Sequence, residues 1–221
     1  MRALVTGFEP YGGRGINPAA ELARAIDGAE LGSVQAVGAR LPVSLEAAPR
    51  ELEALIERHA PDIVLCLGLW PGEPMIRLER IALNRADFEI PDATGRLARD
   101  LALDPGGPDG IAATLPLRAI VQALRAQGIP ARLSGTAGTY LCNATMYALL
   151  NMGHQRWPGL RGGFMHLPYL PEQVAALVQE LEAEQQLELH QRADLASMAF
   201  DTMLQAVRIA LLTTASGHGH A

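Results

Sequence analysis

A single cysteine of this chain stands where a Gly-rich bend meets the start of a helix. The bend spans residues 135–139 and the cysteine is Cys142, with Met146, Leu149 and Leu150 recurring behind it at helical spacing. The unpaired N–H groups of a first helical turn carry partial positive charge, which favours a thiolate and can stabilise an oxyanion beside it. Cys142 is therefore predicted to be the nucleophile of an acyl transfer.

A cysteine nucleophile requires a base, and six histidines compete for this role. His166 closes the apolar segment 163–166, and open α/β sheets place their sites at the carboxyl ends of strands. A histidine satisfied within the core is the alternative for this residue. Glu79 is the best-placed carboxylate to orient the imidazole. It could equally pair with Arg77 or Arg80, and the spacing leaves that choice open.

The second cysteine, Cys66, lies within the continuously apolar segment 62–68 and is predicted to belong to the core. With two cysteines and no segment typical of a signal peptide, we expect a soluble, cytoplasmic protein without a disulfide framework. No apolar run has the length of a membrane span. No cluster of Cys and His has the spacing of a metal site, so we expect neither a metal nor another cofactor.

All 18 basic residues are arginines, and the net charge is −6. The absence of lysine excludes Schiff-base chemistry, attachment of pyridoxal phosphate and a phosphate loop that needs a lysine. The negative charge argues against nucleic acid as a partner. The loop 7–15 matches neither dinucleotide nor P-loop spacing, and Glu9 within it disfavours phosphate. Its aromatic residues, Phe8 and Tyr11, suit a flat apolar ligand.

Strand-like and helix-like segments alternate along the chain. The expected strands are residues 2–6, 34–43, 62–68, 131–134 and 163–166. The expected helices begin at Asn17–Pro18, span 46–59 and 117–127, follow Cys142, and span 172–186 and 195–213. This alternation predicts an α/β sheet covered by helices on both faces. We expect one domain over residues 1–214, a surface excursion at 96–110 and a flexible tail at 215–221.

Four motifs follow one another with compatible gaps between residues 4 and 213. They are TGFEPYGG (6–13) with NP (17–18), ERIALN (79–84) with IPD (90–92), TAGTYLCN (136–143) and RGGFMHLPYLPE (161–172). In these motifs the chain resembles the pyroglutamyl peptidase I family, also called pyrrolidone-carboxylate peptidases, which are cysteine peptidases.

The resemblance implies a three-layer α/β/α sandwich with a mostly parallel, mixed sheet, and a homodimer or homotetramer. It implies an exopeptidase that releases N-terminal pyroglutamate from small peptides with a blocked N-terminus. The family's catalytic triad falls on Glu79, Cys142 and His166. The residues of its substrate pocket fall on Phe8, Tyr11, Ile90, Tyr140 and Leu141.

Two departures from the family concern the pocket. Better-known members have Gly-Gln-Ala-Gly-Gly-Arg after the central strand, where this chain has residues 68–73, Gly-Leu-Trp-Pro-Gly-Glu. Leu69 and Trp70 are therefore expected to form a wall in place of the glutamine. Glu89 stands where many members have an arginine thought to help the oxyanion site. The alternatives are another small amide or acyl substrate for the same triad, a non-catalytic binding protein, or a phosphorylase-like enzyme.

Overall fold

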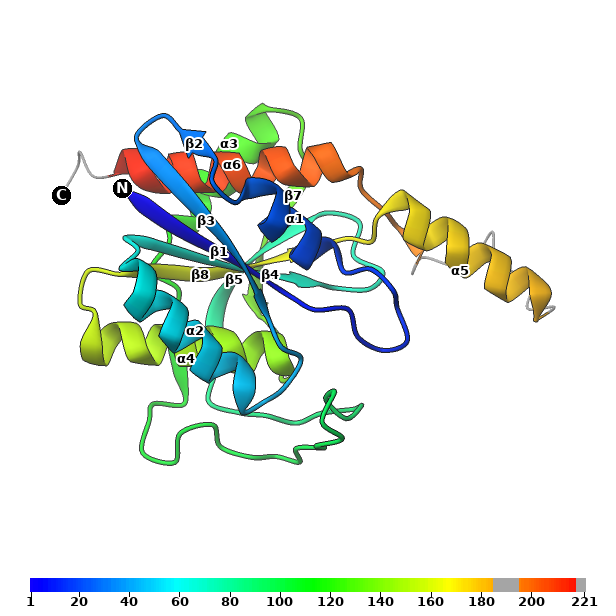
Figure 1. The fold of residues 1–221 in the computed structure, drawn as a ribbon, viewed down its shortest axis with the longest axis horizontal. Helices are drawn as coiled ribbons and strands as arrows, with labels where there is room; N and C mark the ends of the chain where they lie inside the picture. Colours follow the sequence, from blue (N-terminus) through cyan, green and yellow to red (C-terminus); the bar gives the residue numbers. More distant parts are fainter. Residues whose placement is uncertain (185–194, 218–221) are drawn as a thin grey trace.

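A mixed β-sheet forms the centre of the computed structural model, which describes residues 1–184 and 195–217 (Figure 1). Within these residues eight strands pair in the order β2-β3-β1-β4-β8-β5-β6, with β7 also paired to β5. The strands are β1 (Arg2–Phe8), β2 (Glu30–Leu31), β3 (Val34–Leu41), β4 (Ile63–Leu69), β5 (Ile76–Leu83), β6 (Gly110–Ala112), β7 (Ala131–Thr136) and β8 (Arg161–Leu167). The helices are α1 (Pro18–Ile26), α2 (Ala47–His59), α3 (Leu117–Ala126), α4 (Leu141–Arg156), α5 (Pro171–Ala183) and α6 (Phe200–Ser216).

The predicted α/β/α sandwich is confirmed, because helices cover both faces of the sheet (Figure 1). Helices α1, α3 and α6 share one apolar core with the sheet, and α2 and α4 share the other. The strands β3, β1, β4 and β8 are parallel, whereas β5 is antiparallel to β8. No helix of the described residues is long and apolar enough to cross a bilayer.

Several element boundaries differ from those expected. The strand predicted for 34–43 ends at Leu41, since Pro42 has no N–H for the ladder. The last helix begins at Phe200 rather than at residue 195, because the preceding segment pairs with Tyr169 through the N–H of Met198 (2.8 Å). Its other end reaches Ser216, two residues into the expected tail. The remaining tail, 218–221, and the end of the helix predicted for 172–186 lie outside the described residues.

Helix α1 lies unusually close to the sheet because two strand residues facing it are glycines. A Cβ atom on Gly7 would lie 2.0 Å from the carbonyl oxygen of Ala19, and one on Gly38 would lie 1.8 Å from that of Ala23. The side chain of Asn17 caps this helix by accepting the N–H of Ala19 (3.1 Å), as the Asn-Pro pair predicts. The loop between β1 and α1 is thereby held at both ends.

Candidate active site

The sheet register brings the candidate catalytic residues onto one face. His166 of β8 pairs with Gly68 of β4 on one side and with Arg77 of β5 on the other. Directly paired residues point to the same face of a sheet, as do residues two apart on one strand. Glu79, two residues after Arg77, therefore shares this face with His166.

Glu79 and His166 form a hydrogen-bonded pair inside the protein. The Nδ1 atom of His166 lies 2.8 Å from Oε1 of Glu79, and the two residues are 1% and 0% exposed. Burial lowers the pKa of His166, although the hydrogen bond to Glu79 acts in the opposite direction. The imidazole is then neutral at pH 7, with its proton on Nδ1 and donated to the carboxylate. Its Nε2 atom is buried without a hydrogen-bond partner and is free to accept a proton.

Cys142 approaches the same place from the helix layer, in the first turn of α4. A Cβ atom on Gly68 would lie 2.9 Å from the Sγ atom of Cys142, so this glycine makes room for the sulfur beside the strand position of His166. Burial raises the pKa of the Cys142 thiol to about 12, and the negative charge of Glu79 adds to the effect. The backbone N–H at the helix start lowers this pKa, as expected, but burial outweighs its effect. Cys142 is a thiol that needs a base.

The start of α4 is anchored to the strand that carries Glu79. The fully buried Asn143 accepts the N–H of Leu83 (2.8 Å) and donates to the carbonyl oxygens of Leu83 and Arg85 (2.9 Å each). This contact fixes the height of Cys142 above β5. Our reading of the sequence missed this role, although an asparagine directly after the nucleophile, at the head of an apolar helix, is the signal that could have indicated it.

The first turn of α4 also presents hydrogen-bond donors. The cap residue Tyr140 accepts no N–H through its side chain, and the first backbone hydrogen bond runs from the N–H of Ala144 to the carbonyl oxygen of Tyr140 (3.1 Å). The N–H groups of residues 141–143 thus have no acceptor within the helix. They lie where an oxyanion formed next to the Cys142 sulfur would need them.

A small pocket opens next to Cys142. It gathers five of the predicted pocket residues, and the residues that line it are Phe8, Tyr11, Asn17, Val43, Leu69, Tyr140, Leu141 and Cys142. Burial raises the pKa of Tyr11, which leaves the pocket without a charged phenol. Asn17 and Val43 were not expected here, since the sequence patterns indicated only a helix start and a strand end for them.

Trp70 and Ile90 are not among the residues that line this pocket. The ring of Trp70 packs edge-on against the imidazole of His166, with 4.9 Å between centroids, and Phe164 packs against the same imidazole at 4.8 Å. Trp70 therefore covers His166 instead of forming the expected wall of this pocket. Ile90 is 49% exposed on a segment joined to the pocket through the hydrogen bond from the hydroxyl of Tyr140 to the carbonyl oxygen of Pro91 (3.2 Å).

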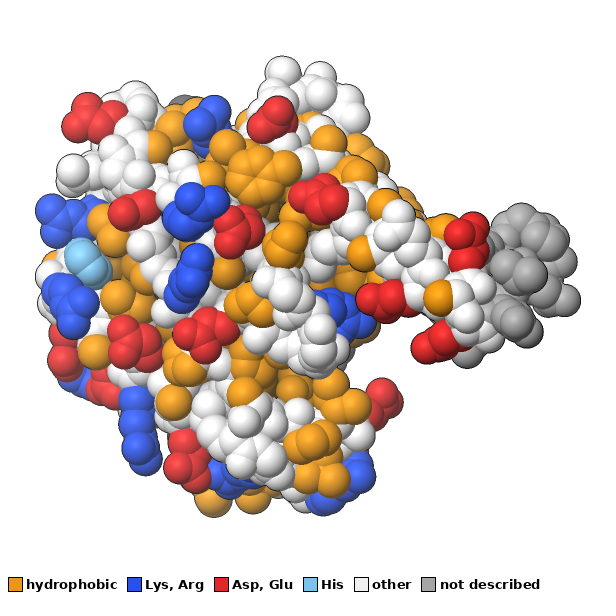
Figure 2. All heavy atoms as spheres, turned by 45° about the vertical axis from the view of Figure 1, so that its right-hand side comes forward, with side chains coloured by type: hydrophobic (Ala, Val, Ile, Leu, Met, Phe, Trp, Pro, Cys, Tyr) orange, Lys and Arg blue, Asp and Glu red, His pale blue; other side chains and the backbone are white. Residues whose placement is uncertain are grey.

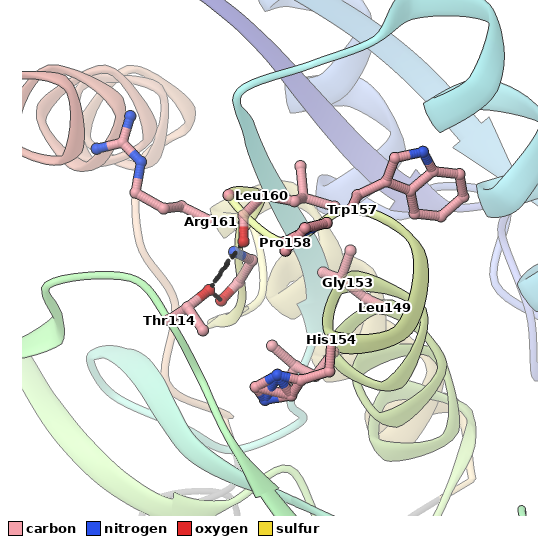
Figure 3. A pocket seen from close by; sticks show the side chains of 11 residues that line it. Thr114, Leu149, Gly153, His154, Trp157, Pro158, Leu160 and Arg161 are labelled. Atoms are coloured by element: carbon pink, nitrogen blue, oxygen red, sulfur yellow. Dashed lines mark hydrogen bonds between the residues drawn. The ribbon is translucent and has the colours of Figure 1, made fainter.

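Another pocket lies at the opposite end of α4 and lacks the groups needed for acyl transfer (Figure 3). Its walls are mostly apolar, and Thr114 in it accepts the N–H of Gly162 (2.7 Å). Figure 3 shows the guanidinium of Arg161 turned away from the pocket, and it donates to the carbonyl oxygen of Thr214. His154 is the remaining titratable side chain in this lining. This arrangement offers no nucleophile.

Among the described residues, the other cysteine and the histidines other than His166 do not join the site. Cys66 is fully buried in β4, and burial raises the pKa of its thiol to about 12, as expected for a core residue. His59 ends α2. The remaining histidines, His190, His218 and His220, lie outside the described residues. Among the residues that the structure describes, no cluster of acidic, cysteine and histidine side chains could hold a metal ion.

Comparisons with known proteins identify the family of this chain. The family model described as pyroglutamyl peptidase matches residues 1–216. The chain is 38% identical over 211 residues to the pyrrolidone-carboxylate peptidase of Pyrococcus furiosus, covering 96% of each chain. It is 39% identical to that of Brevibacillus brevis, covering 96% of this chain and 92% of the relative.

Solved structures are similar over nearly the whole chain. A mutant pyrrolidone carboxyl peptidase from Pyrococcus furiosus matches with a TM-score of 0.91 at 37% identity, covering 99% of this chain and 100% of that one. The pyroglutamyl peptidase I of Bacillus amyloliquefaciens matches with a TM-score of 0.88 at 33% identity, covering 97% of both.

Iodoacetamide should modify Cys142 in the folded protein and leave Cys66 intact, because Cys142 is partly exposed and Cys66 is fully buried. Since burial holds the pKa of Cys142 near 12, the labelling rate should keep rising from about pH 7 to about pH 10. Mass spectrometry of the two cysteine peptides measures both rates, and Cys66→Ser is the matched control. A plateau of the Cys142 rate below about pH 8 would contradict the protonated resting state.

Proposed function

The chain belongs to the pyroglutamyl peptidase family of cysteine hydrolases, and we propose that it releases N-terminal pyroglutamate from peptides by acyl transfer through Cys142, His166 and Glu79. The observation that best supports this assignment is the buried Glu79–His166 pair. It leaves the basic Nε2 atom of His166 without a partner, and Gly68 brings the Cys142 sulfur next to that histidine's strand position.

The protonation states define the first half of the reaction. As the Sγ atom of Cys142 attacks the carbonyl carbon of the pyroglutamyl amide, Nε2 of His166 takes the thiol proton. The carbonyl oxygen becomes an oxyanion and receives hydrogen bonds from the first turn of α4. His166 then gives the proton to the leaving amine as the C–N bond breaks. A pyroglutamyl thioester on Cys142 and a shortened peptide result.

Water completes the reaction. The same Nε2 atom of His166 takes a proton from the water that attacks the thioester, and returns it to the sulfur as the C–S bond breaks. Free pyroglutamate and the thiol form of Cys142 are regenerated. Glu79 stays ionised throughout, because it stabilises the imidazolium and holds its orientation without taking the proton.

The pocket next to Cys142 suits an uncharged, flat lactam. The aromatic rings of Phe8, Tyr11 and Tyr140 and the aliphatic side chains of Leu69 and Leu141 contribute to its lining. Such a ring can be held by apolar contacts together with a few polar groups at its edge. The peptide beyond the scissile bond would extend outward from Cys142.

We also propose that the protein is a homo-oligomer that packs through α5. None of the 13 residues of this helix is buried, and it projects from the body of the molecule (Figures 1 and 2). Val174, Leu177, Val178 and Leu181 repeat at the spacing of an apolar helical stripe. A stripe of this kind is normally covered in a folded protein, and a second copy of the chain is the occupant that the family resemblance favours.

The reducing cytoplasm is the compartment we propose. Cys66 and Cys142 are both free cysteines in the structure, and the nucleophile reacts only as a reduced sulfur. A cytoplasmic environment keeps Cys142 in that form.

Substitution of each triad residue should affect hydrolysis according to its role as nucleophile, base or orienting carboxylate. Cys142→Ser and His166→Ala should abolish hydrolysis of a pyroglutamyl aminocoumarin, whereas Glu79→Gln should lower kcat by about 10²- to 10⁴-fold, because it orients the base without reacting. Activity of the parent should survive EDTA. Full activity of His166→Ala would disprove the assignment, and faster cleavage of the prolyl or glutaminyl analogue by the parent would favour the alternative substrates.

Replacing Tyr11 tests the lactam pocket. Tyr11→Ala should raise KM for the pyroglutamyl substrate by about tenfold with a smaller change in kcat, since an aromatic contact is worth roughly 0.5–1.5 kcal/mol beyond its buried area. Tyr11→Phe keeps the ring and is the matched control. An unchanged KM together with a lowered Tm in Tyr11→Ala would mean that this ring only stabilises the fold.

A charge within the apolar stripe tests the oligomer. Val178→Glu should lower the molar mass measured by sedimentation or light scattering, because it buries an unpaired carboxylate in the interface. Gln179→Glu adds the same charge beside the stripe, at an exposed position of the same helix, and should leave the mass unchanged. A parent that is monomeric at micromolar concentration would contradict the proposal.

A further inference from the structure

Arg77 is a charged side chain in the interior of the protein that the triad mechanism does not use. It is 7% exposed, its two Nη atoms have hydrogen-bond partners, and its Nε atom is in ionic contact with a carboxylate without a hydrogen bond. The Nη2 atom donates to the Oγ atom of Ser134 (2.6 Å), Nη1 lies 3.5 Å from an oxygen of Glu73, and Nε lies 3.1 Å from Oε1 of Glu79. The central carbon lies 3.8 Å from the ring centroid of Trp70.

We propose that Arg77 is a positioning residue for the reaction: clamped by Glu73 and Trp70, its guanidinium holds the Glu79 carboxylate against Nδ1 of His166 and keeps His166 in its proton-accepting form. This inference rests on the proposed function. The oxygen of Glu79 that accepts from His166 is the same one that faces Nε of Arg77, so the two contacts fix one atom from two directions.

The clamp on Arg77 involves Glu73, in the segment just before β5. Glu73 is itself buried, and it pairs with Arg132 through two contacts, of 3.1 and 2.7 Å. A carboxylate at position 73 cannot supply a cation to the site. It can, however, hold the cation that Arg77 supplies from β5.

Trp70 connects this cluster to the base. One face of its indole carries the guanidinium of Arg77, and the same residue contacts the imidazole of His166. A flat guanidinium stacked on an aromatic ring is restricted in rotation, which a lysine ammonium would not be. Trp70 therefore contacts both Arg77 and His166 from its position directly after β4.

The charges around His166 make opposite contributions. The groups that face it are Glu79 and Arg77 from β5, Glu73 from the segment before β5, and Cys142 from α4. The charge of Arg77 lowers the pKa of His166, whereas the charge of Glu73 raises it. Removing the charge of Arg77 should therefore raise the pKa of His166, and removing the charge of Glu73 should lower it. If the two residues only stabilised the fold, their removal would not produce opposite shifts.

Activity profiles test this consequence. In Arg77→Met the acid limb of kcat/KM should move to higher pH by about half a unit or more, and in Glu73→Gln it should move to lower pH. In Arg77→Met kcat should fall by about 10- to 100-fold with little change in KM, because Arg77 does not line the pocket.

Arg77→Lys keeps the charge, so the acid limb of its kcat/KM profile should not move, whereas its kcat should fall. Arg80→Met, the same change at an exposed site of β5, is the control.

A second readout does not depend on turnover. Nitrogen NMR of histidine-labelled protein reports the tautomer and titration of His166, assigned with His166→Gln. The parent should show the proton on Nδ1, and the two charge variants should show the same opposite shifts as their profiles. If the parent does not hydrolyse the pyroglutamyl substrate but the variants show these shifts, the proposed function is refuted and the positioning role of Arg77 is supported. Unshifted titrations, or shifts in one direction, would overturn the inference. If Arg77→Met does not fold, Glu73→Gln and Arg77→Lys decide it.

Discussion

The hydrogen bond between Glu79 and His166 is the interaction on which the rest of the site depends. Neither partner is in contact with solvent, so the carboxylate must be compensated by protein groups alone. Arg77 supplies the neighbouring positive charge, and Glu73 and Arg132 extend the cluster to the surface in alternating sign. Antiparallel pairing of β5 with β8 sets the side chains at the required spacing. The reversed direction of β5, which β7 shares, thus places Glu79 beside His166.

Chemistry and recognition come from different parts of the fold. The proposed base and its orienting carboxylate lie on strands, and the proposed nucleophile lies on a helix that Asn143 ties to one of those strands. Half of the residues that line the pocket come from connecting segments, with Tyr11 on the loop after β1 and Tyr140 just before α4. The proposed reacting atoms are thus held by regular elements, whereas the pocket also depends on loops.

The layers predicted from the sequence are confirmed, and five of the residues predicted for the pocket line one pocket with Cys142. The sequence prediction fails where charges or neighbours that are distant along the chain determine a property. Asn17–Pro18 and the apolar strands are local signals, and they lead to the observed elements. The protonation of Cys142 could not be inferred, because the helix start is a local feature whereas burial and Glu79 act through space. The sequence also left open whether Glu79 pairs with a histidine or an arginine. In the structure its Oε1 atom contacts both His166 and Arg77. Trp70 was misplaced because spacing along the chain does not tell which way a side chain turns after a strand ends.

Three glycines of the sheet limit how this chain can diverge. A side chain at Gly7 or Gly38 would meet the backbone of α1 at 2.0 Å or less, and one at Gly68 would meet Cys142 and Phe164 at 2.9 Å or less. These positions exclude every other residue type unless a whole layer moves. Mutational tolerance is therefore distributed unevenly: β1, β3 and β4 accept no side chain at the points where α1, Cys142 or Phe164 approaches them. Positions without such contacts remain open to substitution, as at Gly15, where a Cβ atom would meet nothing within 4 Å.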